Sequence, residues 1–290
     1  FVHLQCQSEY SVKNSLVRIS KLIDSVKEAG MKSVALTDDM SLFSAIKFYQ
    51  KATSAGIKPI IGAKISVDFD FDFDFDFDHF DVLLLCQNHQ GYLNLSELIS
   101  KAYLNEQGIS NVSVTEEQLI SHQKGLLMIA TPTSSDVSQL LLKNELELAH
   151  TKAKQWQTIF KDRYYISVQR TDRHSDENLL NLTIELGLEL DIPVVATNDV
   201  QFLRKSDFDA HEARICIAEG ALLDDSRRLK FFSDNQYLKT AGEMSELFKD
   251  YPQLIANASE VAKRCNLHFK LFEKNYLPAF PTPKGKSIAE

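Results

Sequence analysis

The sequence lacks the cysteine patterns and long apolar runs that mark several classes of protein. Its four cysteines (Cys6, Cys86, Cys216 and Cys265) are widely spaced, with no CxxC pair and no histidine-rich partner pattern. This spacing argues against a disulfide scaffold and indicates buried free thiols in a reducing compartment. No signal peptide opens the chain, and no apolar run approaches the roughly 18 residues that a membrane span needs. We therefore expect a cytoplasmic globular protein with no membrane segment.

An excess of basic charge is also missing. The chain has 32 Lys and Arg against 40 Asp and Glu, for a net charge of −8. Residues 68–78 read DFDFDFDFDFD and hold six of the aspartates with no basic residue, so the rest of the chain carries only −2. Strong sequence-independent binding of nucleic acid by this chain alone is therefore not expected.

The DF repeat at 68–78 alternates strictly, so an extended segment would place Phe on one face and Asp on the other. Its simplest interpretation is a tolerated insert between two strands. Three alternatives stay open: a hairpin whose Phe face packs on the domain, a strand that binds a partner, and a row of carboxylates that collects calcium or magnesium loosely.

Familiar catalytic signatures are absent as well. The sequence has no GxSxG, HExxH, Walker or GxGxxG motif, and no Ser or Cys has a histidine nearby in sequence. The absence of a Gly-rich fingerprint after any strand argues against dinucleotide binding. His211 lies in a helical pattern, DFDAHEARICIAEG, where we expect a structural histidine rather than a metal ligand.

What the sequence does contain is an alternation of short apolar strands and helical patterns, which is typical of right-handed βαβ units. About six or seven such units in roughly 200 residues favour a barrel over a doubly wound open sheet, the second choice. The fold prediction is α/β: a distorted (βα)7 TIM-like barrel with a helical C-terminal extension. Strands are predicted at 1–7, 33–38, 58–67, 80–87, 126–130, 164–169 and 192–199, and helices at 16–29, 42–55, 91–103, 145–160, 175–188, 208–219, 240–250 and 252–265.

Two helix starts carry capping signals. Ser15 can cap the helix that begins at Leu16, and Gly30 can end it. Ser113 and Glu116 have the spacing of a capping box that opens a helix before the strand at 126–130.

Polar side chains gather at the predicted carboxyl ends of the strands, where βα barrels carry their functional groups. These residues are Gln5, Gln7, Asp38, Asp39, Lys64, His79, Asn198, Asp199 and Gln201. Their identities are poor for catalysis, because glutamine amides are weak ligands and a protonated lysine repels a cation. Only Asp39, His79 and Asp199 could bind a metal directly, and three ligands fall short of a hydrolytic metal cluster.

Several blocks of the sequence together resemble one known family. FVHLQCQSEYS at the start, ALTDDMSLFSAIKFYQKATSAGIKPIIGAKI and LCQNHQGYLNLSELISKAY are followed in order by DRYYISVQR, IPVVATNDVQFLRKSDFDAHEARICIAEG and YLPAFPTPKG. This order is similar to the polymerase-and-histidinol-phosphatase (PHP) domains that open the alpha subunits of bacterial replicative DNA polymerase III. The family's fold, a distorted (βα)7 barrel, agrees with the independent prediction.

The resemblance also implies that the family's metal site has decayed here. Gln5 and Gln7 stand where metal-binding members have a His-x-His pair, and Asn14 stands for an aspartate. In the family's Thr-Asp-His block the aspartate is Asp38, and Asp39 replaces the histidine.

The second half of the implied site is altered in the same way. Lys64 replaces a glutamate, and Pro132 or a neighbour replaces a cysteine. In the late Asp-x-His block only Asp199 is kept, because Gln201 takes the place of the histidine. His79 matches a family histidine.

These matches imply a function. We expect a PHP domain at residues 1–270 and, at 271–290, a linker toward a polymerase core. The domain would have no catalytic residue, metal or cofactor, and the polymerase's Mg²⁺ would lie in a palm outside this chain. It would support that core and dock the proofreading exonuclease subunit, and it would meet DNA only through the full-length protein.

Two alternatives stay open. One is a residual metal-dependent phosphoesterase, of pyrophosphatase or 3′–5′ exonuclease type, that uses Asp39, His79 and Asp199. The other is an unrelated barrel enzyme acting on small molecules. We also expect Lys64 to form an ion pair with Asp39 or Asp199 in place of a metal.

Overall fold

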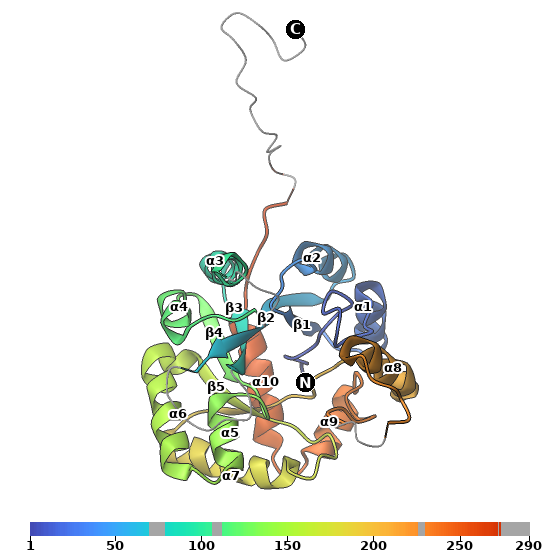
Figure 1. Ribbon diagram of the computed structural model, residues 1–290. Helices are drawn as coiled ribbons and strands as arrows, with labels where there is room; N and C mark the ends of the chain where they lie inside the picture. The colour runs from blue at the N-terminus through green and yellow to red at the C-terminus, as the bar shows by residue number, and fades with distance from the viewer. Residues whose placement is uncertain (70–78, 106–111, 226–229, 272, 274–290) are drawn as a thin grey trace, which may run out of the picture.

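The computed structural model describes residues 1–69, 79–105, 112–225, 230–271 and 273. Within these residues the helices and strands alternate around one curled sheet (Figure 1). The strands are β1 (Ser33–Asp39), β2 (Lys58–Asp68), β3 (His79–Cys86), β4 (Leu126–Ala130), β5 (Tyr164–Val168) and β6 (Val194–Ala196). The helices are α1 (Ile19–Glu28), α2 (Ala45–Ser54), α3 (His89–Asn105), α4 (Glu116–Ser121), α5 (Asp136–Leu142), α6 (Leu146–Phe160), α7 (Asp176–Leu190), α8 (Phe208–Glu219), α9 (Ala241–Leu247) and α10 (Pro252–Arg264).

The sheet has the order β1-β2-β3-β4-β5-β6, so every strand pairs with its neighbour in sequence. All neighbouring strands are parallel except those that involve β3, which is antiparallel to both β2 and β4. The prediction of parallel βαβ units throughout is therefore wrong at this strand. The physical reason is that no helix separates β2 from β3, so the chain reverses and returns beside the strand it has just left.

Residues near the N-terminus lie between the two edges of the sheet. The carbonyls of His3 and Cys6 accept hydrogen bonds from Ala35 and Thr37 in β1, at 2.9 and 2.8 Å. On the other side, Gln7 and Val200 bond to each other's segments through Gln7 N to Val200 O (3.1 Å) and Val200 N to Gln5 O (3.0 Å). The segment 3–7 thereby connects β1 to the turn that follows β6.

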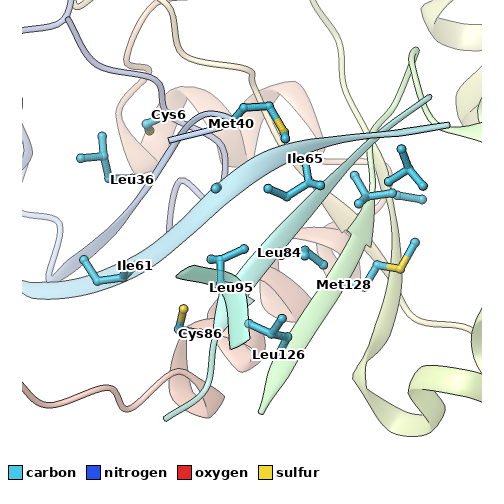
Figure 2. Close-up of a cluster of buried hydrophobic side chains, with 14 of the residues drawn as sticks. Cys6, Leu36, Met40, Ile61, Ile65, Leu84, Cys86, Leu95, Leu126 and Met128 are labelled. Carbon is cyan, nitrogen blue, oxygen red and sulfur yellow. The ribbon is translucent and has the colours of Figure 1, made fainter. Parts of the chain in front are cut away.

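Apolar side chains on the outer face of the sheet pack against the surrounding helices. Figure 2 shows part of this cluster: Cys6, Leu36, Met40, Ile61, Ile65, Leu84, Cys86, Leu95, Leu126 and Met128. Because successive side chains of a strand point to opposite faces, Leu36, Ile61 and Leu84 turn outward while Ala35, Ile60 and Leu83 turn inward. All four cysteines are buried and free, as predicted.

The inward-facing side chains form a second apolar cluster, which α10 covers from below. Ala258, Val261, Ala262 and Cys265 of this C-terminal region join the cluster with interior residues of the strands such as Val195. Asn257 Nδ2 and Lys58 Nζ add hydrogen bonds, each 2.8 Å long, to the carbonyls of Val194 and Ala262. The apolar half of the sheet's interior is therefore closed by the last helix of the chain.

Two of the predicted helix caps are wrong. The first helix begins at Ile19 rather than Leu16, because the Ser15 hydroxyl donates to the carbonyls of Gln7 (2.8 Å) and Gln201 (3.0 Å) instead of capping a helix. The capping box of α4 lies two residues later than predicted, between Thr115 and Gln118. Val114 is held extended by backbone hydrogen bonds to β2, so a helix cannot start before it.

Candidate functional site

Most of the polar residues predicted from the strand ends line a cavity of about 670 Å³, here called the central cavity. It contains six of the predicted positions: Gln5, Gln7, Asn14, Lys64, Asp199 and Gln201. Pro132, which stands for the family's cysteine, lines it too. A second cavity of about 540 Å³, the rim cavity, holds Asp39 and His79 and shares Asn14 and Lys64 with the first. The predicted residues therefore converge, but on two adjoining cavities.

The largest cavity found in the described residues, about 1090 Å³, lies elsewhere. It runs between α7 and α10 and is lined by residues such as Leu188 and Leu254. None of the predicted site residues lines it. Size alone therefore does not locate the chemistry, and the polar groups of the central cavity are the better guide.

Strand alternation explains which side chains enter the site. In β1 the inward positions include Ala35 and Asp39, so the intervening Asp38 faces outward. There Asp38 accepts hydrogen bonds from the backbone N–H of Ser8 (2.6 Å) and from the hydroxyls of Ser8, Ser11 and Ser44. Asp38 lines neither cavity, and it ties the loop after residue 7 to the start of α2. Its inclusion among the site positions is therefore not supported by the geometry.

The centre of the site is an ion-pair cluster built on Lys64. Lys64 Nζ lies 3.4 Å from Asp39 Oδ1 and 3.2 Å from Asp81 Oδ2. Ser66 donates a 2.8 Å hydrogen bond to the other oxygen of Asp81. The expected pairing of Lys64 with Asp39 is therefore present, and no ion pair between Lys64 and Asp199 occurs among the described residues.

The charge states of this cluster follow from its surroundings. Burial lowers the pKa of Lys64, but the carboxylates of Asp81, Asp39 and Asp199 outweigh burial and raise it above its ordinary value. Burial raises the pKa of Asp81, but the Lys64 ammonium and the Ser66 hydroxyl outweigh that effect and lower it. Both groups are therefore charged at neutral pH, and the cation in this part of the site is a lysine.

Asp199 is held in a different way, by neutral amides. Gln5 Nε2 and Gln201 Nε2 donate to its Oδ1 at 2.9 and 2.8 Å, and Gln236 Nε2 donates to its Oδ2 at 2.9 Å. The backbone of Asp199 has φ 44°, a left-handed conformation that Asp tolerates better than most residues. The carboxylate that survives at this position therefore receives amide N–H groups where a metal ion would need its lone pairs.

The remaining predicted residues have modest roles. Asn14 Nδ2 donates to Asp39 Oδ2 at 3.2 Å. Asn198 Nδ2 bonds the carbonyls of Asn235 (3.1 Å) and Tyr237 (2.8 Å), and so holds the returning chain rather than the cavity. His211 is fully buried and its Nε2 bonds the carbonyl of Asn14 at 2.7 Å, in agreement with its structural assignment.

Two residues of the site were not anticipated. Asp81 could have been found, because it is the one charged residue inside the apolar run FDVLLLC of β3. Gln236 had no such signal, since it arrives from a segment 37 residues after Asp199 in the chain. That segment is fixed by further bonds between Gln201 N and Gln236 O (3.0 Å) and between Leu238 N and Phe202 O (3.1 Å).

The donor set does not fit a hydrolytic metal centre. No group of three or more His, Cys, Asp or Glu with the geometry to hold a metal ion occurs among the described residues. Asp39 and His79 line the rim cavity whereas Asp199 lines the central one, so the three proposed ligands do not share a cavity. The Lys64 ammonium lies between them, where it would repel a cation. None of the described helices is long and apolar enough to cross a membrane.

Comparison with known proteins agrees with these observations. The family model "PHP domain" matches residues 3–171. The DNA polymerase III subunit alpha of Pseudomonas fluorescens is 42% identical over 290 residues, which is 100% of this chain and 24% of the relative. The Escherichia coli K12 protein of the same name is 40% identical over 282 residues, 97% of this chain and 24% of the relative. The chain thus spans about a quarter of the length of these curated relatives.

Solved structures give a weaker likeness. An amidohydrolase from Chromobacterium violaceum matches with a TM-score of 0.47 and 10% identity, over 78% of this chain and 99% of that one. A metal-dependent phosphoesterase from Bifidobacterium adolescentis matches with a TM-score of 0.43 and 12% identity, over 68% of this chain and 86% of that one. The match of the family model over more than half of the sequence is decisive, and the chain belongs to the PHP domain family.

Proposed function

We propose that this chain is the non-catalytic PHP domain of a bacterial replicative DNA polymerase, the DNA polymerase III alpha subunit. The full-length protein would be a DNA-directed DNA polymerase, and its Mg²⁺ would bind in a palm outside these residues. Supporting this, relatives with that name align with 97–100% of this chain at 40–42% identity. A replicative polymerase of this kind would work in the cytoplasm.

The observation that carries the non-catalytic role is the position of the Lys64 ammonium between Asp39 and Asp81. It supplies one positive charge to the carboxylates from within the chain. A metal ion that entered beside it would face an adjacent cation and would have to displace the amides bound to Asp199. Such a site can stabilise the fold, but it does not activate water.

The finer description of the fold is part of the same proposal. Segment 3–7 would act as a seventh strand that completes a distorted (βα)7 barrel, and its hydrogen bonds to β1 and Val200 support this. The domain would extend to about residue 270, since α10 covers the apolar interior and Phe269 packs on Tyr49 and Tyr92 with ring centroids 4.9 and 4.7 Å apart. Residues 271–290 would link it to the polymerase core.

The domain would also bind the proofreading exonuclease subunit. Support comes from the rim cavity, whose lining includes the exposed apolar side chains of Val12 (71% exposed), Phe43 (83%) and Tyr103 (51%). Exposed apolar groups gathered at one rim are typical of a protein contact. The DF repeat lies outside the described residues except for its first two positions, so its role remains one of the alternatives given above.

Metal content tests the non-catalytic role most directly. The purified chain is incubated with zinc and manganese, dialysed extensively and analysed for bound metal. We expect near-zero stoichiometry and no metal-stimulated hydrolysis of a phosphomonoester or of single-stranded DNA. One or more tightly held ions per chain, with hydrolysis that Asp199→Ala abolishes, would instead establish the phosphoesterase alternative.

A binding experiment tests the partner. The full-length alpha subunit carrying Phe43→Glu is mixed with the exonuclease subunit, and complex formation is followed by size-exclusion chromatography. We expect weaker association than for the parent subunit. Leu188→Glu is the matched control, because Leu188 is 79% exposed but lies by the cavity between α7 and α10. Equal binding by all three proteins would place the docking surface elsewhere.

A further inference from the structure

Unpaired polar atoms are concentrated around the central cavity. Among the described residues, buried side-chain atoms without a hydrogen-bond partner include the Oε1 atoms of four glutamines that line it. These are Gln5, Gln7, Gln169 and Gln201, which are only 1–5% exposed. Buried amide oxygens are nearly always paired in folded proteins, so four in one cavity indicate a missing partner.

The orientation of two of these amides is determined by Asp199. Gln5 and Gln201 direct their Nε2 groups at its carboxylate, at 2.9 and 2.8 Å. Because an amide carries its oxygen on the side opposite its donated hydrogen bond, these two oxygens turn away from Asp199. The side chain of Gln7 makes no hydrogen bond among the described residues, so its oxygen is free to serve the same partner.

The charges of the site are also unbalanced. The carboxylates of Asp39, Asp81 and Asp199 face one ammonium, that of Lys64, which makes ion pairs with the first two. No cationic nitrogen of a described residue lies within 4.0 Å of Asp199. Arg173 stands at the cavity wall, but its guanidinium donates to Thr133 and to the carbonyl of Phe231.

We propose that the central cavity binds a small monovalent cation, such as potassium, through the amide oxygens of Gln5, Gln7, Gln169 and Gln201. Neutral carbonyl oxygens can replace the hydration shell of such an ion. Calcium and magnesium sites use carboxylates directly, and here the carboxylates are occupied by Lys64 and by amide N–H groups. A divalent ion would also be repelled twice as strongly by the lysine.

The test is a comparison of salts at constant ionic strength. Thermal unfolding of the 290-residue chain is measured in potassium chloride and in N-methylglucamine chloride, whose cation is too large to enter. We expect an unfolding midpoint about 2–4 °C higher in potassium chloride, the size expected for a weakly bound ligand that stabilises the native state. In crystals soaked with thallium(I), anomalous scattering should appear beside Gln7.

Variants assign the effect to the site. Gln7→Leu removes one oxygen without breaking a hydrogen bond of a described side chain and should abolish most of the potassium shift, while exposed Gln90→Leu should keep it. If Gln7→Leu does not fold, Gln169→Leu serves the same purpose. Identical midpoints in the two salts, or a potassium shift that survives in the site variants, would overturn the proposal. A larger shift with millimolar magnesium or manganese that Gln7→Leu removes would overturn it as well, in favour of a divalent ion.

Discussion

Lys64 Nζ lies 3.2 Å from Asp81 Oδ2, across the antiparallel pair β2–β3. In the register of these strands Ser66 is opposite Asp81 and Lys64 is opposite Leu83, so the two charged residues are diagonal neighbours. A diagonal partner lies within reach of a long side chain. The reversal of β3 thus places a carboxylate beside the lysine, and the ion pair depends on that reversal.

Replacement of Lys64 should destabilise the fold. Lys64→Met leaves Asp39 and Asp81 facing each other without a cation, and removal of one partner from a largely buried ion pair costs about 3 kcal/mol or more. Urea unfolding of the variant and the parent measures this difference. Lys249→Met is the control, because the Lys249–Glu246 pair is exposed and should change the unfolding free energy by less than about 1 kcal/mol. Equal stability of Lys64→Met and the parent would mean that the cluster contributes little.

Adjacent aspartates should differ in their effect on stability. Asp38→Ala removes the acceptor of one backbone N–H and three hydroxyls, all buried, and should cost about 3 kcal/mol or more. Asp39→Ala should cost about 1 kcal/mol, since this carboxylate is 34% exposed and is bound only by Asn14 and Lys64. Unfolding free energies of the two variants decide the matter, and the reverse order would refute the outward assignment of Asp38.

A buried carboxyl group on α5 should make stability depend on pH. Burial raises the pKa of Asp136 to about 6, against the hydrogen bond that Trp156 Nε1 donates to it at 2.7 Å. The native state then binds this proton more tightly than the unfolded chain, whose carboxyl has a pKa of about 3.9. The contribution to stability is therefore full below pH 4 and is lost as the pH rises to about 6, by roughly 2–3 kcal/mol.

The variant Asp136→Asn isolates this contribution, because an amide keeps an oxygen for Trp156 but does not titrate. Unfolding free energies are measured between pH 4 and pH 7.5. We expect the decline between pH 4 and pH 6 to be shallower in the variant than in the parent. Parallel pH profiles for the two proteins would show that Asp136 titrates alike in the folded and unfolded states.

The interior face of β6 should not tolerate charge. Val195 is fully buried in the apolar cluster that α10 covers, so Val195→Asp buries a carboxylate with no partner and should cost about 4 kcal/mol or more. Leu188→Asp, at an exposed position of α7, should cost less than about 1 kcal/mol. Thermal unfolding compares the two variants. A parent-like midpoint for Val195→Asp would contradict the inward direction of this side chain.

Local patterns in the sequence were sufficient to place most elements. The apolar runs that predicted strands correspond to β1 through β6, since a buried strand must be apolar wherever it packs on both faces. The same reasoning located the site, because Gln5, Lys64 and Asp199 follow or end such runs. It failed at Ser15 and Ser113, where a hydroxyl that could cap a helix bonds elsewhere or precedes the true cap. Capping competes with long-range hydrogen bonds that no local pattern contains.

The sequence by itself determined the alternation of strands and helices, the polar character of the site and the loss of metal-binding residue types. Only the tertiary structure decided that β3 runs against its neighbours, that Lys64 pairs with Asp81 as well as Asp39, and that Gln236 reaches Asp199. The reason is physical: periodicity and composition reflect contacts within a few residues. Ion pairs and amide clusters, in contrast, join side chains 17 to 194 positions apart, whose meeting depends on how the whole sheet curls.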